Sequence, residues 1–460
     1  MTELAAFVPA SFRDPAGFIF LLNGSLYRQV NPVYREQYEH LVGSGLYDSL
    51  VGSGLLVPHE EVAGDFAMTP EAYKILRPQR VPFVSYPYEW CFSQLKDAAL
   101  TTLKIQKMAL SYGMILKDSS AYNIQFCSGK PILIDTLSFD FYHEGAPWVA
   151  YRQFCEHFLA PLCLMAYRDV RLGQLLRVHL DGTPLDLASS LLPWRTRVKP
   201  SLFLHIHMHA KSQRLFAPRP VPARRVNVSR RALLGILDSL QSAVDSLKWS
   251  PGATQWADYY EHTNYSESAL EQKKRIVAEW LDHVAPTTVW DLGANTGLFS
   301  RLASTREIPT VAFDVDPGAV ETNYRRCVTD NEQHLLPLVL DLTNPSPGIG
   351  WENRERLSIL ERPRPEVVLA LALMHHLVIG NNLSFEKLST FFAHICQSLI
   401  IEFVPESDSQ VQRLLVNREP SYSDYTSQGF ESAFGRHFKI EQVVPIAGSE
   451  RLMYRMIKVS

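Results

Sequence analysis

The sequence predicts an α/β protein whose C-terminal half holds one open, mostly parallel sheet and whose N-terminal half is a separate α+β domain. In Thr288–Val320 an apolar run ends in Asp291, a glycine turn and an amphipathic segment follow, and a second apolar run ends in Asp314. This order is typical of a strand, turn, helix and strand in a parallel sheet. Later, Val367–Met374 is almost continuously apolar, as a central parallel strand should be.

Composition narrows the classes of protein and of partner. With 460 residues, 46% of them hydrophobic and 20% charged, the chain resembles a soluble globular protein of two or three domains. A net charge of −3 gives no general electrostatic reason to bind nucleic acid or a membrane. The six cysteines form no C-x-x-C pair, so we expect reduced thiols, no metal centre and a cytoplasmic protein. There is neither a signal-like N-terminus nor an apolar run of about 18 residues to span a membrane. Nothing in the sequence indicates the oligomeric state.

The N-terminal domain is predicted over residues 1–192. Gly17–Val30 contains two β-type runs joined by Asn23-Gly24, which is the strongest short signal for a hairpin. Cys91–Tyr112 has apolar residues at helical spacing and predicts one long helix. We therefore expect a small sheet followed by a helix.

A pattern of polar residues follows that helix. Asp118 and Asn123 are separated by four residues, and a short hairpin then ends in Asp135. The pattern resembles the catalytic loop and metal-binding strand of protein-kinase-like folds. That resemblance implies that Asp118 accepts a substrate proton, while Asn123 and Asp135 hold Mg²⁺ on phosphates. Because Leu116-Lys117 replaces the usual His-Arg and no G-x-G-x-x-G loop precedes it, we interpret the three residues as a vestigial phosphotransfer site. The alternative is an unrelated domain in which they cap turns.

Residues 193–249 are predicted to form a basic, Pro-rich linker and a helix between the two domains. Arginine and lysine accumulate here, acidic residues are absent from most of it, and the prolines disfavour a helix in its middle part. His205, His207 and His209 would share one face of an extended segment, as in a zinc site, but no thiolate or carboxylate accompanies them. We interpret them as a structural cluster.

The glycine turn of the C-terminal half distinguishes between cofactors. A dinucleotide site requires G-x-G-x-x-G, whereas Asn295 stands at the middle position and the third glycine is absent. The pattern D-x-G-x-x-x-G from Asp291 instead resembles the first motif of class I S-adenosylmethionine-dependent methyltransferases. The resemblance implies that Asp291 meets the methionine ammonium and that Asp314 holds the ribose. The residues of the turn expected to bind the cofactor are Gly293, Asn295 and Gly297.

The resemblance covers residues 250–460, which are predicted to form one Rossmann-like methyltransferase domain. A third apolar run ends in Asp341, where the resemblance implies a polar residue near adenine. An aromatic segment and a helix precede the first strand, in the place where many class I methyltransferases close over the cofactor. Tyr265 of this segment is predicted to contact the cofactor. Trp256, Tyr259, Tyr260 and Lys273 are further candidates for cofactor or substrate contact, the alternative being that the aromatic rings belong to the core.

His375 and His376 follow the fourth strand of this domain. Nucleic-acid and glutamine methyltransferases have a D/N-P-P-Y/F motif there, which accepts planar amino groups and is absent here. A neutral imidazole near pH 7 is a suitable base for a hydroxyl proton, so we expect methylation of oxygen rather than nitrogen. His376 is the preferred base, and the alternative is a structural pair of histidines.

Three stretches resemble the nodulation-protein NoeA-like group of bacterial methyltransferases: H-H-L from His375, I-E-F-V-P around Glu402 and D-L-T-N-P-S-P-G from Asp341. The resemblance implies a small-molecule or carbohydrate-type acceptor. Two other functions stay open. In the first, the N-terminal domain transfers phosphoryl groups, and the protein is a bifunctional or kinase-type enzyme. In the second, both halves form a non-enzymatic scaffold.

Overall fold

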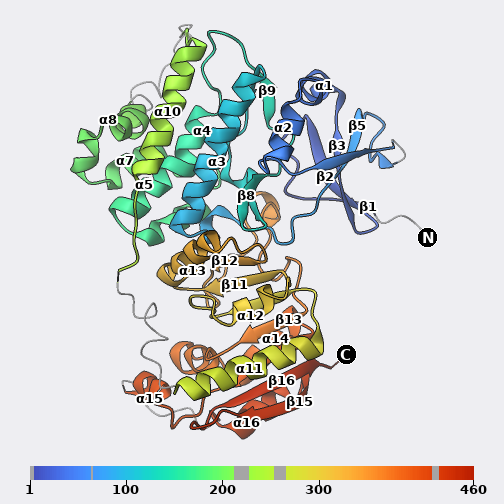
Figure 1. Cartoon of the computed structure of the whole chain (residues 1–460), viewed down its shortest axis with the longest axis vertical. Coiled ribbons are helices and arrows are strands. Elements are labelled where there is room, and N and C mark those ends of the chain that lie inside the picture. The colour runs from blue at the N-terminus through green and yellow to red at the C-terminus, as the bar shows by residue number, and fades with distance from the viewer. Residues whose placement is uncertain (1–4, 64–65, 212–226, 253–265, 417–423, 460) are drawn as a thin grey trace. The chain divides into compact units, whose positions relative to one another are not determined.

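The structure is a computed structural model that describes residues 5–63, 66–211, 227–252, 266–416 and 424–459. The chain divides into two compact units (Figure 1). Unit 1 comprises Met1–Trp249 and Gly348–Leu357, and unit 2 comprises Ser250–Pro347 and Ser358–Ser460. Among the described residues, none of the helices is both long and apolar enough to cross a lipid bilayer.

Unit 1 begins with a five-stranded antiparallel sheet in the order β1-β2-β3-β5-β4. The predicted hairpin is present between β2 and β3, where Asn23 and Gly24 have φ of 50° and 79°, as a two-residue turn of type I′ requires. The strands are β1 (Ala5–Phe7), β2 (Gly17–Leu22), β3 (Ser25–Val30), β4 (His59–Val62) and β5 (Lys74–Pro78), with helices α1 (Arg35–Gly43) and α2 (Leu46–Gly52) between β3 and β4.

The predicted long helix of unit 1 is α3 (Phe92–Ser111), whose apolar stripe is buried at Leu95, Ala99 and Leu103. Two short strand pairs follow, with Asp118 and Asn123 in the loop between β6 and β7 and with Asp135 just after β8. This order of helix, loop and hairpin agrees with the kinase-like resemblance. The strands are β6 (Met114–Leu116), which pairs with β9 (Phe139–Phe141), and β7 (Ile124–Cys127), which pairs with β8 (Lys130–Leu133).

The described part of the predicted linker, residues 193–211 and 227–249, belongs to unit 1 and packs there. Helix α10 (Arg230–Ser246) lies against α3, where Lys107 Nζ is 2.6 Å from Asp238 Oδ1. His205 and His207 each hydrogen-bond through both ring nitrogens, His205 to the hydroxyls of Tyr151 and Ser239 and His207 to those of Ser189 and Thr196. These bonds favour the structural interpretation of the histidines. The other helices of unit 1 are α4 (Tyr151–Phe154), α5 (Ala160–Tyr167), α6 (Leu175–Val178), α7 (Leu185–Leu191) and α8 (Pro200–Leu202).

Unit 2 contains a seven-stranded sheet in the order β12-β11-β10-β13-β14-β16-β15. Its strand pairs are parallel except those of β16, which runs antiparallel to both β14 and β15. This order, with the first strand central and one strand near the edge reversed, is that of Rossmann-like class I methyltransferases, so the predicted fold class is confirmed. The strands are β10 (Val289–Leu292), β11 (Thr310–Asp314), β12 (Leu335–Val339), β13 (Val367–Ala370), β14 (Ser398–Phe403), β15 (Phe438–Pro445) and β16 (Leu452–Lys458).

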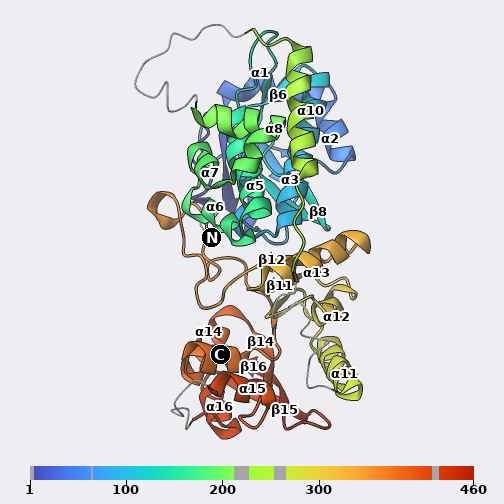
Figure 2. The same ribbon diagram turned by 90° about the vertical axis from the view of Figure 1, so that its left-hand side faces the viewer.

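Helices cover the sheet of unit 2, and α12 and α13 lie beside β11 and β12 in both views (Figures 1 and 2). The central strands β10 and β13 are buried at every position, as parallel strands covered on both faces must be. The helices are α11 (Glu267–Val284), α12 (Ser300–Ser304), α13 (Pro317–Thr329), α14 (Phe385–Ile395), α15 (Ser409–Leu415) and α16 (Ser427–Phe434).

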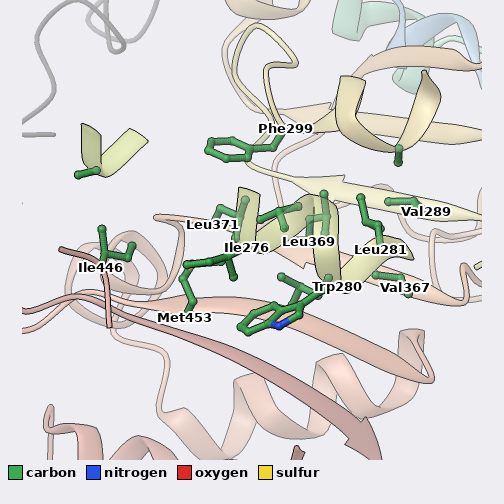
Figure 3. Packing of buried hydrophobic residues seen from close by; sticks show 14 residues of the cluster. Ile276, Trp280, Leu281, Val289, Phe299, Val367, Leu369, Leu371, Ile446 and Met453 are labelled. Carbon is green, nitrogen blue, oxygen red and sulfur yellow. The ribbon is translucent and has the colours of Figure 1, made fainter. Parts of the chain in front are cut away.

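Helix α11 fixes one face of this sheet. Its Ile276, Trp280 and Leu281 recur at helical spacing and pack on apolar residues of the strands, among them Val289 and Leu369 (Figure 3). Burying one such side chain contributes about 1.5–3 kcal/mol to folding. Because Lys273 lies two turns or so before Trp280 on the same helix, this packing also fixes the position of the lysine.

Candidate functional site

Unit 2 contains a cavity of about 370 Å³ at the carboxyl ends of its parallel strands. Open α/β sheets bind their ligands at this edge. The residues just after β10, β11, β12 and β13 line the cavity, and α11 contributes Lys273 and Leu270. Seven residues predicted from the sequence are on its wall, namely Lys273, Asp291, Gly293, Asn295, Asp314, Asp341 and His376.

The glycine turn forms part of this wall and has an unusual backbone. Gly293, Asn295 and Gly297 all have positive φ, of 77°, 50° and 78°. An added Cβ at Gly293 would lie 3.2 Å from Leu373 Cδ1, in a conformation that L-residues rarely adopt. The turn is held by the Asn295 backbone N–H, which donates to Asp314 Oδ2 at 2.7 Å.

Gly297 occupies a different environment from the one predicted. It is not among the residues that line the cavity, and an added Cβ would lie 2.5 Å from the Asn323 amide and 2.7 Å from the Arg301 guanidinium. Close packing of these side chains therefore requires a glycine here. The role predicted for Gly297 in contacting the cofactor has no support in this geometry.

Two carboxylates of the cavity are buried and hydrogen-bonded. Burial raises the pKa of Asp291 to about 6, although the Ser300 hydroxyl, which donates to Oδ2 at 2.6 Å, and the nearby Lys273 charge act in the opposite direction. Burial also raises the pKa of Asp314 to about 6, against the backbone N–H groups of Asp316 and Asn295 that donate to it. Both groups are therefore anionic at neutral pH but take up protons more easily than ordinary aspartates.

Asp341 follows β12, the third strand whose carboxyl end contributes to the cavity wall. Its Oδ1 accepts hydrogen bonds from the Thr343 backbone N–H at 2.8 Å and from the Thr343 hydroxyl at 2.6 Å. Apolar side chains of Leu340 and Leu342 flank it on the cavity wall. Tyr265, and with it Trp256, Tyr259 and Tyr260, lies outside the described residues.

A buried chain of alternating charges begins at the cavity. Lys273 Nζ is 2.6 Å from Glu402 Oε2, Arg451 Nη1 is 3.3 Å from Glu402 Oε1, and Arg451 Nε is 2.7 Å from Asp408 Oδ2. Burial lowers the pKa of Lys273, and the charge of Glu402 opposes that shift. Sequence analysis named Lys273 and Glu402 but missed Arg451 and Asp408, because an arginine before a strand usually faces solvent and an aspartate before a helix usually serves only as its N-cap.

The two histidines after β13 are in contact but have different surroundings. Their ring centroids are 4.1 Å apart, and only His376 is on the cavity wall. Burial lowers the pKa of His376 to about 4, so its imidazole is neutral at pH 7. His375 is fully buried, and neither of its ring nitrogens has a hydrogen-bond partner among the described residues.

The predicted phosphotransfer residues of unit 1 are connected through hydrogen bonds. Asp118 Oδ1 accepts from the Gln153 amide at 2.7 Å, and the Asn123 amide donates to the Ser138 hydroxyl at 3.3 Å. The Ser138 hydroxyl in turn donates to Asp135. Ser138 thus bridges Asn123 and Asp135, and the Asn123 side chain is close enough to Asp118 to oppose the rise in its pKa that burial causes.

Asp135 is neutralised by a side chain that sequence analysis missed. Arg28, on β3, forms an ion pair with its Oδ1, and the Leu137 backbone N–H donates to the same oxygen at 3.3 Å. Burial raises the pKa of Asp135, but the Arg28 charge and the hydrogen bonds outweigh it and the pKa is lowered. A guanidinium thus occupies one oxygen that a metal ion would need. Lys74, on β5, pairs with Glu61 at 2.6 Å.

Sequence comparison finds a relative that matches nearly the whole chain. No family model matches it. Nodulation protein NoeA of Rhizobium meliloti (strain 1021) is 33% identical over 461 residues, which is 97% of this chain and 95% of that protein. The chain belongs to the NoeA family. Since the match covers nearly all of both chains, the NoeA relationship includes unit 1 as well as unit 2.

Solved structures resemble parts of this NoeA-family chain. Magnesium protoporphyrin IX methyltransferase (ChlM) from Synechocystis PCC 6803, crystallised with bound SAH, is 14% identical and covers 44% of this chain and 93% of its own, with a TM-score of 0.32. The bifunctional kinase-methyltransferase WbdD is 12% identical and covers 45% of this chain and 43% of its own, with a TM-score of 0.32.

Proposed function

We propose that unit 2 is an S-adenosylmethionine-dependent methyltransferase that methylates an oxygen of a small-molecule or carbohydrate-type acceptor. The observation that carries this proposal is the pair of buried carboxylates, Asp291 and Asp314, beside a glycine turn with positive φ on one cavity wall. This combination of charge and backbone shape sits at the sheet edge where the class I fold binds its ligand.

The residues of the cavity fit this cofactor. Asp291 would accept hydrogen bonds from the methionine ammonium, and Asp314 would accept them from the ribose hydroxyls. Asp341, with Leu340 and Leu342 beside it on the cavity wall, would hold the adenine. The bound cofactor supplies an electrophilic methyl group on a sulfonium.

Lys273 supplies a positive charge to the same cavity. Its ammonium lies 4.7 Å from the centroid of the Phe299 ring and 2.6 Å from Glu402 Oε2. A buried cation beside Asp291 is suited to a carboxylate, and we assign it to the carboxylate of the methionine group. The amino-acid end of the cofactor would then meet one anion, Asp291, and one cation, Lys273.

His376 is the base in this proposal. Its imidazole is neutral at pH 7 because burial lowers its pKa to about 4, and it lines the cavity. With the cofactor bound, His376 would take the proton of the acceptor hydroxyl, and the cofactor would supply the methyl group to that oxygen and keep the electron pair of the cleaved carbon–sulfur bond. A general base accelerates such a reaction by about 10²–10⁴-fold, and a pKa of about 4, well below the operating pH, places His376 toward the lower end of that range.

Unit 1 serves as a binding or scaffold module in this proposal. Asp118, Asn123 and Asp135 are assembled, which keeps phosphoryl transfer as a second candidate function. The ion pair between Arg28 and Asp135 favours the scaffold, because transfer of a phosphoryl group needs that carboxylate to bind a metal ion.

Calorimetry with S-adenosylmethionine and S-adenosylhomocysteine tests the proposal. Wild-type protein should bind both, and Gly293→Val should abolish binding because φ is 77° and Leu373 is in contact. Gly235→Ala is the control, since no atom lies within 4 Å of the added carbon there. Wild-type affinity in Gly293→Val would remove the turn from the site, and no binding by the wild type would refute the cofactor.

A further inference from the structure

The segment Gly348–Leu357 comes between β12 and β13 of unit 2 in the sequence, yet it is part of compact unit 1. Its two ends are joined by paired hydrogen bonds of 3.0 Å between Ile349 and Arg356. Gly350 has φ of 83°, and an added Cβ there would lie 2.4 Å from Glu355 Cβ. The segment is therefore a closed loop whose shape depends on a glycine.

Glu355 attaches this loop to the start of unit 1. Its two carboxylate oxygens accept from Arg13 Nε at 2.6 Å and from Arg13 Nη2 at 2.9 Å, while the carboxylate is only 3% exposed. The Arg13 hydrogen bonds lower the pKa of Glu355, so the pair stays charged. Bidentate pairs of this type are among the strongest hydrogen-bonded contacts in proteins.

Arg356 and Leu357 attach the loop at two further places. The guanidinium of Arg356 lies 4.2 Å from the centroid of the Tyr122 ring, and the Leu357 backbone N–H donates to the Tyr86 hydroxyl at 2.8 Å. Tyr122 lies between Asp118 and Asn123 in the loop of the predicted phosphotransfer site. An arginine over an aromatic ring contributes about 0.5–2 kcal/mol, depending on its desolvation.

Arg13 belongs to the connection between β1 and β2, and its neighbour Asp14 is 3.2 Å from Lys117, the residue before Asp118. In protein kinases the loop near the first strands covers the nucleotide phosphates. Here the charged residues of this connection pair with protein groups instead, one of them with Glu355.

We propose that unit 1 holds Gly348–Leu357 as a permanently docked loop, and that holding this loop is how unit 1 supports methyl transfer. Thr343, on the cavity wall of unit 2, precedes Gly348 by only five positions in the chain. A loop held at Gly348–Leu357 therefore restricts the backbone of Asp341–Thr343, where the proposed function places the adenine. This second step rests on that proposed function, whereas the first does not.

Trypsin and calorimetry on the full chain test both steps. Arg13→Glu places a like charge opposite Glu355, and Arg13 is 60% exposed, so the substitution spares the core. We expect cleavage after Arg354 and Arg356, mapped by mass spectrometry, to become about tenfold faster, and S-adenosylhomocysteine affinity to fall about tenfold, each equal to about 1.4 kcal/mol. Glu355→Gln, which keeps the shape of the side chain, should act in the same direction.

Arg171→Glu is the matched control, because Arg171 is an exposed arginine of unit 1 in a two-bonded pair with Asp169. It should change neither measurement. Unchanged cleavage in Arg13→Glu and Glu355→Gln would contradict the proposal that unit 1 holds the loop. Faster cleavage with unchanged affinity would overturn the link to the cavity. If the wild type binds no S-adenosylhomocysteine, the proposed function fails, while the cleavage rates still decide whether the loop is held.

Discussion

Lys273 and Glu402 form an ion pair of 2.6 Å in which both side chains are almost completely buried, at 3% and 0% exposure. The pair joins helix α11 to strand β14 and continues through Arg451 to Asp408. Each charge in this chain has an opposite charge beside it, which is the condition under which buried charges are tolerated. The same contact holds the Lys273 ammonium at the cavity.

Glu402→Gln should lower the free energy of unfolding by about 3–5 kcal/mol, because it leaves Lys273 and Arg451 without their shared carboxylate. Lys273→Met should cost less, since Glu402 keeps Arg451 as a partner. Urea denaturation measures both. Glu271→Gln on the same helix is the control: it breaks the exposed pair with Lys274 and should cost less than about 1 kcal/mol. Equal losses at Glu402 and Glu271 would contradict a structural role for the buried chain.

Cofactor affinity should depend on pH through Asp291. Its pKa of about 6 in the free protein means that a proton occupies it at lower pH and must leave before the carboxylate accepts an ammonium. Affinity should therefore be constant above about pH 7 and weaken by up to about tenfold per pH unit below the pKa. Calorimetry between pH 5 and 8 measures this. Asp291→Asn should bind weakly at every pH, with a flatter profile, and an unchanged slope in this variant would assign the titration to another group such as Asp314.

The two histidines should respond differently to substitution. His376→Ala should keep the melting temperature and cofactor affinity but lose methyl transfer by about 10²–10⁴-fold, as expected for a base. His375→Ala should instead lower stability, because it leaves a cavity in a fully buried site. His375→Phe should cost little, since the ring nitrogens of His375 make no hydrogen bond to any described residue that would be lost. Normal turnover in His376→Ala would exclude it as the base.

The order of strands and the placement of the cavity acids were predictable from the sequence. Asp291, Asp314 and Asp341 each end an apolar run, and parallel strands bring such ends to one edge of a sheet. The roles of the two histidines were less accessible. Two adjacent residues after a strand are expected to direct their side chains to opposite sides. Only the fold shows that His376 faces the cavity and His375 the core.

Buried charges were the main features that the sequence did not reveal. Arg28 and Arg451 each stand near a β-type run, where an isolated arginine usually faces solvent, and their partners Asp135 and Glu402 are more than 40 positions away. The loop Gly348–Leu357 is rich in charged residues and predicts an exposed connection. Its attachment to unit 1 depends on Arg13, Tyr86 and Tyr122, which are remote in the sequence.

Unit 1 should not turn over Mg²⁺·ATP, because Arg28 already neutralises Asp135. Asp135→Ala should leave the rate of methyl transfer at saturating substrate unchanged. It should nevertheless lower the stability of unit 1 by about 3–5 kcal/mol, since it leaves the Arg28 guanidinium, only 12% exposed, without its partner. Phosphate release and thermal unfolding measure the two effects.

The double variant Arg28→Met/Asp135→Leu is the control for that loss. Replacing a buried ion pair by apolar side chains of similar volume is often neutral or stabilising, so the double variant should recover most of the stability that Asp135→Ala loses. Recovery would show that Asp135 is needed for its charge balance with Arg28 and not for a metal ion. ATP turnover in the wild type that disappears in Asp135→Ala would instead establish phosphoryl transfer as an activity of unit 1, because a carboxylate engaged only in a structural ion pair has no part in that reaction.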